Sequence, residues 1–508
     1  MERDRTLTPP CTRREILGAA LAGLTPKTDR RVTGSFVNES HPLGHRLRDR
    51  AAFRAPAETV RIPLVIVGGG IAGLSAAWRL LKRGFSDFVV LEMELEGGGN
   101  SRWGQNEASS YPWAAHYVPA PNRKSELVRE LFEEFGLLHN GEPEERHLCF
   151  SPQERLFIHG RWHEGLEPLV AATAADRDQS RQFQQRMEDF RATGQFTIPV
   201  DEGARPSPLD QTSMASWLSA NGFTSAPLRW YVDYACRDDY GAAIADTSAW
   251  AGIHYFAARE HEEKGPFTWA QGNGWIAERL LARAAKQVRA NSPVYRIARE
   301  GRRFRVFTGQ IAYLPDAVIF AAPTFLAPYV LEDAPPIRGF QYSPWLTANL
   351  TLDRVPQNRG FDYAWDNVIY DSPSLGYVVA THQDLRTHIE RTVWTYYWAL
   401  ARGTPAENRR LLLDRDWNYW KEAILNDLAR AHPDIRACVS RIDIMRLGHA
   451  MVRPAPGFMF SEDRRGMAER RAGNLWFANS DLSGISIFEE AQYRGVRAAD
   501  AALKTLQR

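Results

Sequence analysis

The chain has 508 residues, 44% of them hydrophobic, so two or three globular domains with a large core are expected. The 63 basic and 61 acidic residues give a net charge of +2, which offers no electrostatic basis for binding nucleic acid. No apolar run reaches the ~18 residues that a transmembrane helix needs. The four cysteines form no Cys-x-x-Cys pair and show no metal-binding spacing with histidine, so neither a metal nor a membrane span is expected.

The first 24 residues have the pattern of an export signal. Residues 12–14 read Thr-Arg-Arg and precede a short, modestly apolar stretch at 18–24. A basic segment before a short apolar one is typical of a signal peptide, and the paired arginines resemble a twin-arginine signal. We expect residues 1–24 to direct export to the periplasm; the alternative is a frayed basic helix on a cytoplasmic protein. Residues 25–60 are polar and are predicted to be a linker or surface arm.

Residues 64–92 carry the strongest signal: a buried strand, a glycine turn, a helix, a second buried strand and a terminal acid, Glu92. The G-x-G-x-x-G spacing allows a tight turn, close approach of a pyrophosphate and helix-on-strand packing. The residues of the turn and the helix start that we expect to contact the dinucleotide are Gly68, Gly70, Ile71, Ala72 and Gly73. The helix N-terminus suits phosphates, and Glu92 suits a ribose hydroxyl. We predict a site for an adenine dinucleotide, FAD or NAD rather than NADP, because an acid disfavours a 2′-phosphate.

The rest of the chain alternates between helical and strand-like patterns. Helices are predicted at 124–138, 176–193, 275–288, 407–431 and 488–506, and strands at 303–307, 316–323, 345–352, 392–400 and 475–478. Apolar and polar residues alternate along 345–352, which predicts a half-buried strand. In the 392–400 strand, Trp394, Tyr396 and Trp398 share a face that either lines a cavity or, as we favour, packs the domain.

These elements, in this order, resemble the FAD-dependent amine oxidase superfamily, which includes monoamine and polyamine oxidases, protoporphyrinogen oxidase and phytoene desaturases. The resemblance has four anchors: the glycine unit with Glu92, the Gly98-Gly99 loop, the 272–274 turn with the 316–323 strand, and the 475–478 strand with the last helix. It implies an α/β fold, with a discontinuous Rossmann-like FAD/NAD(P)-binding domain and an inserted α+β substrate domain. The implied segments are FAD-binding parts at 61–120, 265–330 and 446–508, and substrate-domain parts at 121–264 and 331–445.

The resemblance also implies where FAD would be held, and that it would be held without a covalent link, since no cysteine lies near the C-terminal positions. The implied contacts are Gly98, Gly99, Asn100, Arg102, Val294 in the strand before 303–307, Asp481, Glu490 and Ala491. The last helix would direct its N-terminus at the flavin, where it stabilises the charge of the reduced ring.

Two departures from the family pattern affect the expected chemistry. Asn100 stands where an arginine is usual, with Arg102 two residues later. The lysine that holds a water near the flavin in these amine oxidases is missing from the matching strand at 345–352, where Asn349 or Thr347 would hold the water instead.

We therefore expect hydride transfer from an amine or similar small molecule to FAD, with oxygen or a quinone as electron acceptor and a monomer or homodimer as the working form. His116 is the candidate acid or base, or else a structural histidine. Trp113 is a candidate wall of the site, or else a core residue. The acidic stretch at 233–241 either attracts a cation or is a solvated helix end.

Two other functions stay open at this point. The missing lysine favours an FAD-dependent desaturase or oxidase of a hydrophobic substrate. Near the last strand the chain reads Ala478-Asn479-Ser480-Asp481, where the family usually has Ala-Gly-Glu or Ala-Gly-Asp. This altered C-terminal motif is compatible with a flavin-binding protein that does not catalyse a reaction.

Overall fold

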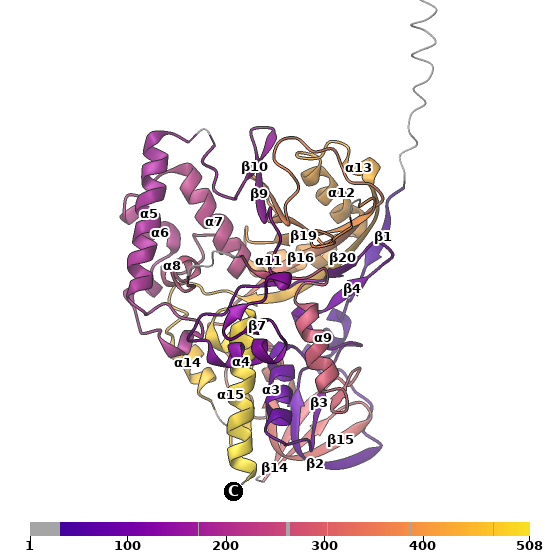
Figure 1. Ribbon diagram of the computed structural model, residues 1–508. Helices are drawn as coiled ribbons and strands as arrows, with labels where there is room; N and C mark the ends of the chain where they lie inside the picture. The colour runs from indigo at the N-terminus through magenta and orange to yellow at the C-terminus, as the bar shows by residue number, and fades with distance from the viewer. Residues whose placement is uncertain are drawn as a thin grey trace, which may run out of the picture.

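The computed structural model describes residues 31–170, 172–260, 265–301, 303–386, 389–470 and 472–507. In these ranges the chain forms two domains, each built around one large sheet; the parallel-sheet domain lies at the bottom of Figure 1 and the antiparallel-sheet domain at the top. The predicted signal at 1–24 lies outside the described residues, as does Cys11. The other three cysteines are buried free thiols, and none of the described helices is long and apolar enough to cross a membrane.

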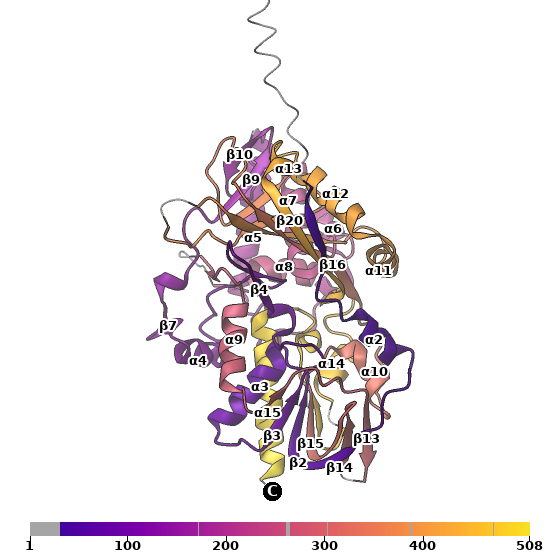
Figure 2. The same cartoon turned by 90° about the vertical axis from the view of Figure 1, so that its right-hand side faces the viewer.

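The parallel-sheet domain has a seven-stranded sheet in the order β12-β3-β2-β15-β14-β13, with β21 also paired to β15. Its strands are β2 (Glu58–Val67), β3 (Phe88–Leu91), β12 (Val288–Arg289), β13 (Arg296–Glu300), β14 (Arg303–Phe307), β15 (Ile311–Phe320) and β21 (Leu475–Phe477). Strands β12, β3, β2, β15 and β21 run parallel, and β13 and β14 add an antiparallel edge. In Figure 2 the strands of this sheet fan out at the bottom of the molecule, beside its helices. The domain collects its strands from three separate parts of the chain, which confirms the predicted discontinuous α/β fold.

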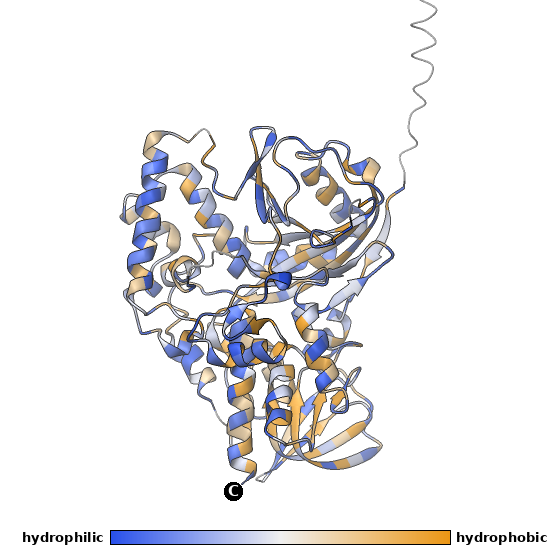
Figure 3. Ribbon diagram, viewed as in Figure 1, coloured by the Kyte–Doolittle hydropathy of each residue, from blue (hydrophilic) through white to orange (hydrophobic). Residues whose placement is uncertain are grey.

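The central strands of this sheet are buried on both faces because their side chains alternate between two apolar layers. Leu64 and Ile66 pack under α3 (Ile71–Lys82) and α15 (Phe488–Leu506), whereas Val65 and Val67 face the opposite layer. The strands are accordingly among the most hydrophobic segments in Figure 3. The other helices of this domain are α2 (His41–Arg48), α4 (Glu126–Glu134), α9 (Gly274–Arg283), α10 (Ala327–Val330) and α14 (Glu462–Ala468).

The antiparallel-sheet domain has an eight-stranded sheet in the order β1-β20-β16-β19-β18-β17-β9-β10. Its strands are β1 (Thr33–Phe36), β9 (Glu154–Ile158), β10 (Arg161–Glu164), β16 (Tyr342–Leu352), β17 (Asp366–Ile369), β18 (Gly376–Val379), β19 (Thr392–Ala399) and β20 (Val439–Val452). Its helices are α5 (Ala174–Ala192), α6 (Met214–Ala220), α7 (Ala226–Tyr240), α8 (Ala249–Ala257), α11 (Pro405–Asp414), α12 (Trp417–Leu428) and α13 (Ile435–Cys438).

Short two-stranded ribbons lie outside the two large sheets. These pair β4 (Trp103–Gln105) with β5 (Ser110–Pro112), β6 (Tyr117–Val118) with β11 (Phe267–Thr268), and β7 (Leu138–His139) with β8 (Glu142–Pro143). The first two ribbons lie in the segments that follow the glycine loop and precede α9.

The structure corrects four details of the sequence analysis. Residues 25–60 are not simply an arm, since β1 pairs in parallel with β20 and α2 follows it. The expected domain boundary at 445/446 falls inside β20, which is one continuous strand. The helix predicted at 407–431 is two helices, because Asp416 caps the start of α12. Strand β16 is buried along its whole length rather than on one face.

Candidate functional site

The glycine turn after β2 is shaped by steric demands that only glycine meets. Gly68 has φ +103°, and a Cβ on Gly73 would lie 1.9 Å from the carbonyl oxygen of Gly68. The glycine loop at 97–99 packs directly on this turn: the Gly98 N–H donates to the Gly69 carbonyl at 2.8 Å. A Cβ on Gly99 would lie 3.1 Å from the Cα of Gly70. The two glycine segments therefore form one cradle of exposed backbone.

The cradle ends in groups that suit a dinucleotide. Gly70 caps α3 without a side-chain hydrogen bond, and the N–H groups of Ile71, Ala72 and Gly73 have no backbone acceptor among the described residues. The Glu92 carboxylate accepts hydrogen bonds from the N–H groups of Gly69 at 2.7 Å and Glu94 at 2.8 Å. Burial raises the pKa of Glu92, and these two bonds counteract that rise. The turn thus offers free donors for phosphate and a fixed acid beside them.

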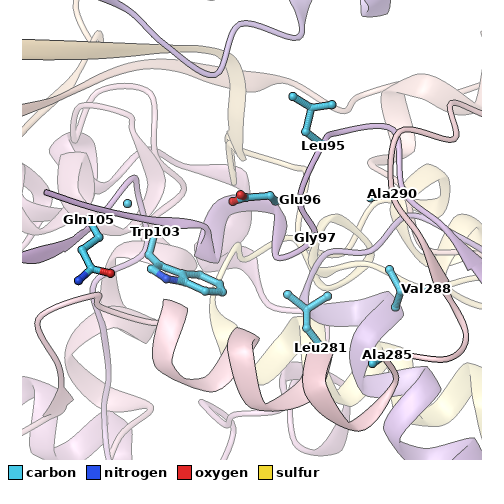
Figure 4. Close-up of a pocket in the computed structure, with 10 residues that line it drawn as sticks. Leu95, Glu96, Gly97, Trp103, Gln105, Leu281, Ala285, Val288 and Ala290 are labelled. Carbon is cyan, nitrogen blue, oxygen red and sulfur yellow. The ribbon is translucent and has the colours of Figure 1, made fainter.

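A groove of about 530 Å³ flanks the loop on the side of α9 (Figure 4). Gly97 forms part of its wall, and a Cβ there would lie 2.7 Å from a methyl group of Leu281. A side chain at this position would therefore displace that methyl group.

The other cofactor residues predicted in the loop region lie near the cradle, and the side chains of Asn100 and Arg102 form hydrogen bonds within the protein. The Asn100 amide donates to the carbonyl of Ala450 in β20 at 3.0 Å, and Arg102 donates to the Gly99 carbonyl at 3.1 Å. Val294 lies just before β13 rather than in a strand, two residues after Ser292, whose N–H donates to the Glu92 carbonyl at 2.7 Å. Their contacts with a cofactor stay predictions.

The C-terminal cofactor residues lie at the start of α15 and in the turn before it. Asp481 accepts hydrogen bonds from the Thr324 N–H at 2.9 Å and the Tyr342 hydroxyl at 2.7 Å. The Glu490 carboxylate accepts a bond from the Val200 N–H at 2.6 Å, and burial raises its pKa to about 7. Ala491 packs between the layers on α15. Asp481 and Glu490 therefore tie α15 to neighbouring segments, and their predicted contact with the flavin stays untested.

A second cavity, of about 250 Å³, lies where the two domains meet. It is lined by His116, Tyr117, Pro119, Glu154, Leu166, Tyr234, Asp238, Asp239, Tyr255, Arg259, Pro266, Trp365, Asp366, Leu375 and Tyr397. His116 and Tyr117 belong to the segment after the glycine loop, which is held there by the Ala115 N–H donating to the Asn100 carbonyl at 2.9 Å. The other walls come from α7, α8 and strands of the antiparallel sheet.

Aromatic rings close around one part of this cavity. His116 stacks on Tyr397 with 4.4 Å between ring centroids, and Trp365 meets both His116 and Tyr117 within 5.7 Å. His116 is thus a wall of the cavity. Its Nδ1 lies 3.2 Å from the Ala114 carbonyl, and burial lowers its pKa to about 4, so the ring is neutral at physiological pH.

Four carboxylates line the same cavity: Glu154, Asp238, Asp239 and Asp366. Burial raises the pKa of each; Asp238 reaches about 7 and Asp239 about 6. The charges of the other acids raise the pKa of Asp238 and Asp366 further. By surface accessibility Glu154 is exposed and Asp238, Asp239 and Asp366 are half-buried, because all four face the open cavity.

The carboxylates differ in their partners. Asp239 is influenced by Arg259, which donates to Glu489 of α15 at 2.8 Å. In the part of the chain that the structure describes, no basic side chain forms an ion pair with Glu154, Asp238 or Asp366. Carboxyl groups therefore outnumber basic groups in the cavity lining, and their raised pKa values keep part of them protonated near neutral pH.

The comparison with protein families decides what the cradle holds. A model described as FAD dependent oxidoreductase matches residues 63–485, which include the cradle and most of both domains. The chain belongs to this family. FAD fits the residues present: a glycine cradle that side chains would fill, free N–H groups at the start of α3, and Glu92 for the ribose.

Individual relatives of this FAD-dependent oxidoreductase are distant. A Baeyer-Villiger monooxygenase from Penicillium patulum is 30% identical over 150 residues, which are 28% of this chain and 23% of that protein. An L-amino acid dehydrogenase from Synechocystis sp. is 25% identical over 306 residues, 57% of this chain and 61% of that protein. The chain therefore spans less than two thirds of either relative.

Among solved structures, a putrescine oxidase with putrescine bound has a similar fold. The TM-score is 0.67 and the sequences are 16% identical, with 88% of this chain and all of that chain covered. This likeness confirms the two-domain fold of the oxidoreductase.

The structure places two of the predicted catalytic residues outside the cavity lining. Trp113 packs edge-on against Tyr111, and its carbonyl accepts a hydrogen bond from Thr347 at 2.7 Å. Asn349 donates to the Pro112 carbonyl at 3.0 Å and accepts from Thr395 at 2.7 Å. Both therefore brace β16 against the segment that leads to His116, and a water-holding role for Asn349 stays untested.

Several cavity residues carried no signal in the sequence. Glu154, Tyr255, Arg259, Trp365 and Asp366 are spread over more than 200 residues and follow no motif. Among the sequence predictions, His116 and the acidic stretch at 233–241 pointed to this site, and of that stretch Tyr234, Asp238 and Asp239 line the cavity.

Proposed function

We propose that this FAD-dependent oxidoreductase oxidises a small amine. The observation that carries the proposal is the cavity between the domains, in which unpaired carboxylates stand beside aromatic faces. Carboxylates attract an ammonium group, and the faces of Tyr and Trp rings stabilise a cation near them. The fold shared with an amine-oxidising enzyme supports the same choice.

The size of the cavity favours a small substrate over a large hydrophobic one. A volume of about 250 Å³ lies below the ~300–1,000 Å³ of pockets that take drug-sized ligands. A tetrapyrrole or a carotenoid has several times as many heavy atoms as a small amine. The desaturase alternative also lacks support from the lining, since four carboxylates disfavour an apolar guest.

The residues around the cavity can prepare an amine for oxidation. The ammonium must lose its proton before a hydride can leave the neighbouring carbon, and Asp238, with a pKa of about 7, accepts and releases a proton near neutral pH. His116 and Tyr397 present a stacked wall that excludes water. When bound, FAD supplies the hydride acceptor. The amine becomes an imine, which water hydrolyses to a carbonyl compound and ammonia.

Anaerobic reduction of the holoenzyme tests this function. The full-length protein with bound FAD is mixed with a panel of primary amines, and the visible absorbance of oxidised flavin is followed. We expect an amine substrate to bleach the flavin. We expect ammonia to be released when oxygen or a quinone, the two acceptors that we propose, is admitted later. If dithionite bleaches the flavin but no amine does, the proposed function is contradicted. A non-catalytic role would then be favoured.

A further inference from the structure

We propose that Glu490 is a proton acceptor coupled to the cofactor: its carboxylate takes up one proton from solvent when bound FAD is reduced. This role does not depend on which molecule supplies the electrons.

The first turn of α15 lies between the glycine cradle and the substrate cavity. Further along the helix, Gly495 packs on the start of α3, where a Cβ would lie 2.0 Å from the Ala72 carbonyl oxygen. In the first turn, Glu489 accepts its hydrogen bond from Arg259 of the cavity wall. Glu490 precedes Gly495 by five residues, a rise of about 7.5 Å along the helix. A dinucleotide that binds the cradle and accepts a hydride in the cavity therefore passes this turn.

Glu490 is completely buried, yet only one of its carboxyl oxygens is bonded. Oε1 accepts from the Val200 N–H at 2.6 Å, whereas Oε2 has no hydrogen-bond partner in the part of the chain that the structure describes. Oε2 of Glu489, in the same turn, is also buried without a partner in that part of the chain. Buried acceptors are normally satisfied, so these two oxygens indicate that a hydrogen-bond donor outside the polypeptide belongs beside this turn.

The cations near Glu490 are engaged elsewhere. Arg494 of α15 and Arg464 of α14 influence its charge, but both donate to the Leu482 carbonyl, at 3.2 and 2.6 Å. Arg494 also pairs with Asp201 at 2.8 Å. Within the described ranges neither guanidinium forms an ion pair with Glu490. A fixed positive charge therefore does not hold this carboxyl group in its ionised form.

The pKa of Glu490 lies where a small change of local charge moves a proton. Burial is the main cause that raises this pKa to about 7, Asp201 adds to the rise, and the charge of Arg494 opposes it. The Ser483 hydroxyl and the Val200 N–H also oppose it. Val200 is followed by the exposed Asp201, so the buried carboxyl group lies close to solvent.

Reduction adds charge at the helix end that Glu490 occupies. A hydride carries two electrons and one proton, so its transfer leaves one negative charge on the cofactor. The positive end of α15 then has two anions to stabilise, and the like charge raises the pKa of Glu490 above its value in the oxidised state. The Glu490 carboxylate therefore binds one proton from solvent, and no further electrons move.

Electrochemical reduction of the holoenzyme tests this role without a substrate. At a fixed electrode potential, the visible absorbance gives the ratio of reduced to oxidised flavin at each pH between 7 and 9. We expect this ratio to fall by about 10-fold more per pH unit in the native enzyme than in Glu490→Gln, because the native enzyme binds one more proton per flavin. Glu462→Gln, an exposed acid in the first turn of α14, is the matched control and should behave like the native enzyme.

Infrared difference spectra of the native holoenzyme give a second measurement, which does not require the variant to fold. We expect reduction at pH 8 to produce the carbonyl band of a protonated carboxyl group. This band should shift in D₂O, and it should be absent from Glu490→Gln and present in Glu462→Gln.

Other outcomes overturn the proposal. Equal pH dependence of the native enzyme and Glu490→Gln, or no carboxyl band on reduction of the native enzyme, means that Glu490 takes up no proton. A band that survives in Glu490→Gln and is lost in Asp238→Asn places the proton on a cavity acid instead. Because no amine is present, these results stand even if the enzyme oxidises no amine.

Discussion

Glu489 in the first turn of α15 accepts a hydrogen bond from Arg259 at 2.8 Å, across the boundary between the two domains. The Glu489 side chain is 1% exposed and that of Arg259 is 26% exposed, so the pair joins a buried helix start to the cavity wall. Glu489 also raises the pKa of the cavity residue Asp239. The pair therefore links the start of α15, in the cofactor domain, to the charge of Asp239 in the substrate cavity.

Removing the charge of Glu489 should weaken amine binding. In Glu489→Gln, the carboxylate of Glu489 no longer offsets the positive charge of Arg259 at the cavity, so we expect KM for an amine substrate to rise by about 5-fold or more, with a smaller change in kcat. Steady-state kinetics of the holoenzyme measure both. The matched control is Glu462→Gln, an exposed acid in the first turn of α14. An unchanged KM in Glu489→Gln would show that the pair serves only the fold.

Gly73 should be essential for FAD binding. Its Cβ would meet the Gly68 carbonyl at 1.9 Å, so Gly73→Ala must push α3 away from the cradle, at a cost of about 3 kcal/mol in unfolding free energy. We expect the purified variant to lose its bound flavin, measured as FAD per protein. Gly466→Ala is the control, because a Cβ there meets nothing within 4 Å. A yellow Gly73→Ala protein with normal stability would contradict the packing argument.

The acids of the cavity should destabilise the substrate-free enzyme as pH rises. Asp238 has a pKa of about 7 in the folded protein against an ordinary value of 3.8, so between these values the folded state binds more protons than the unfolded state. Stability is then lost as pH rises through this window. Replacing Asp238 by Asn removes that loss.

We therefore expect the Tm of Asp238→Asn relative to the native enzyme to be higher at pH 8 than at pH 5, by roughly 2 °C. Thermal unfolding of both proteins at the two pH values gives this double difference. Asp362→Asn, which removes an exposed acid near β17, should show none. A difference of the opposite sign would mean that Asp238 is not held in a protonated form.

The export proposal depends on Arg13 and Arg14. We expect the double substitution to lysine to keep the protein in the cytoplasm, because the twin-arginine route reads the arginine pair itself. Cell fractionation with immunodetection measures the distribution. The same change at Arg30 and Arg31, a second arginine pair nearer the folded domains, is the control. Equal periplasmic amounts of both variants would argue against the signal.

Local features of the sequence were sufficient for the cofactor domain. The turn at Gly68, Gly70 and Gly73 is contiguous, and its steric demands act over a few residues, so its spacing predicted both the fold and the dinucleotide site. The helix predicted at 488–506 matches α15, since its pattern was long and uninterrupted. The shared face of Trp394, Tyr396 and Trp398 packs the core, as favoured.

Burial by a distant segment misled the prediction for β16. The polar residues of this strand looked solvated, but Thr347 and Asn349 donate hydrogen bonds to the carbonyls of Trp113 and Pro112. The Thr351 hydroxyl accepts a hydrogen bond from the side-chain amide of Asn106 at 3.0 Å. A polar face can be buried when backbone groups of another segment satisfy it, and alternation alone does not distinguish that case from exposure.

The sequence by itself determined the nucleotide cradle, because the residues that its tight turn and close packing need are neighbours in the chain. Only the tertiary structure decided the substrate cavity. Glu154 and Asp366 become neighbours because β9 and β17 pair in register, and Asp238 joins them because α7 packs beside that pair. Acidic and aromatic side chains at these positions form a site only because they lie close together. Sheet register and domain packing, rather than local pattern, bring together residues that are more than eighty positions apart in the sequence.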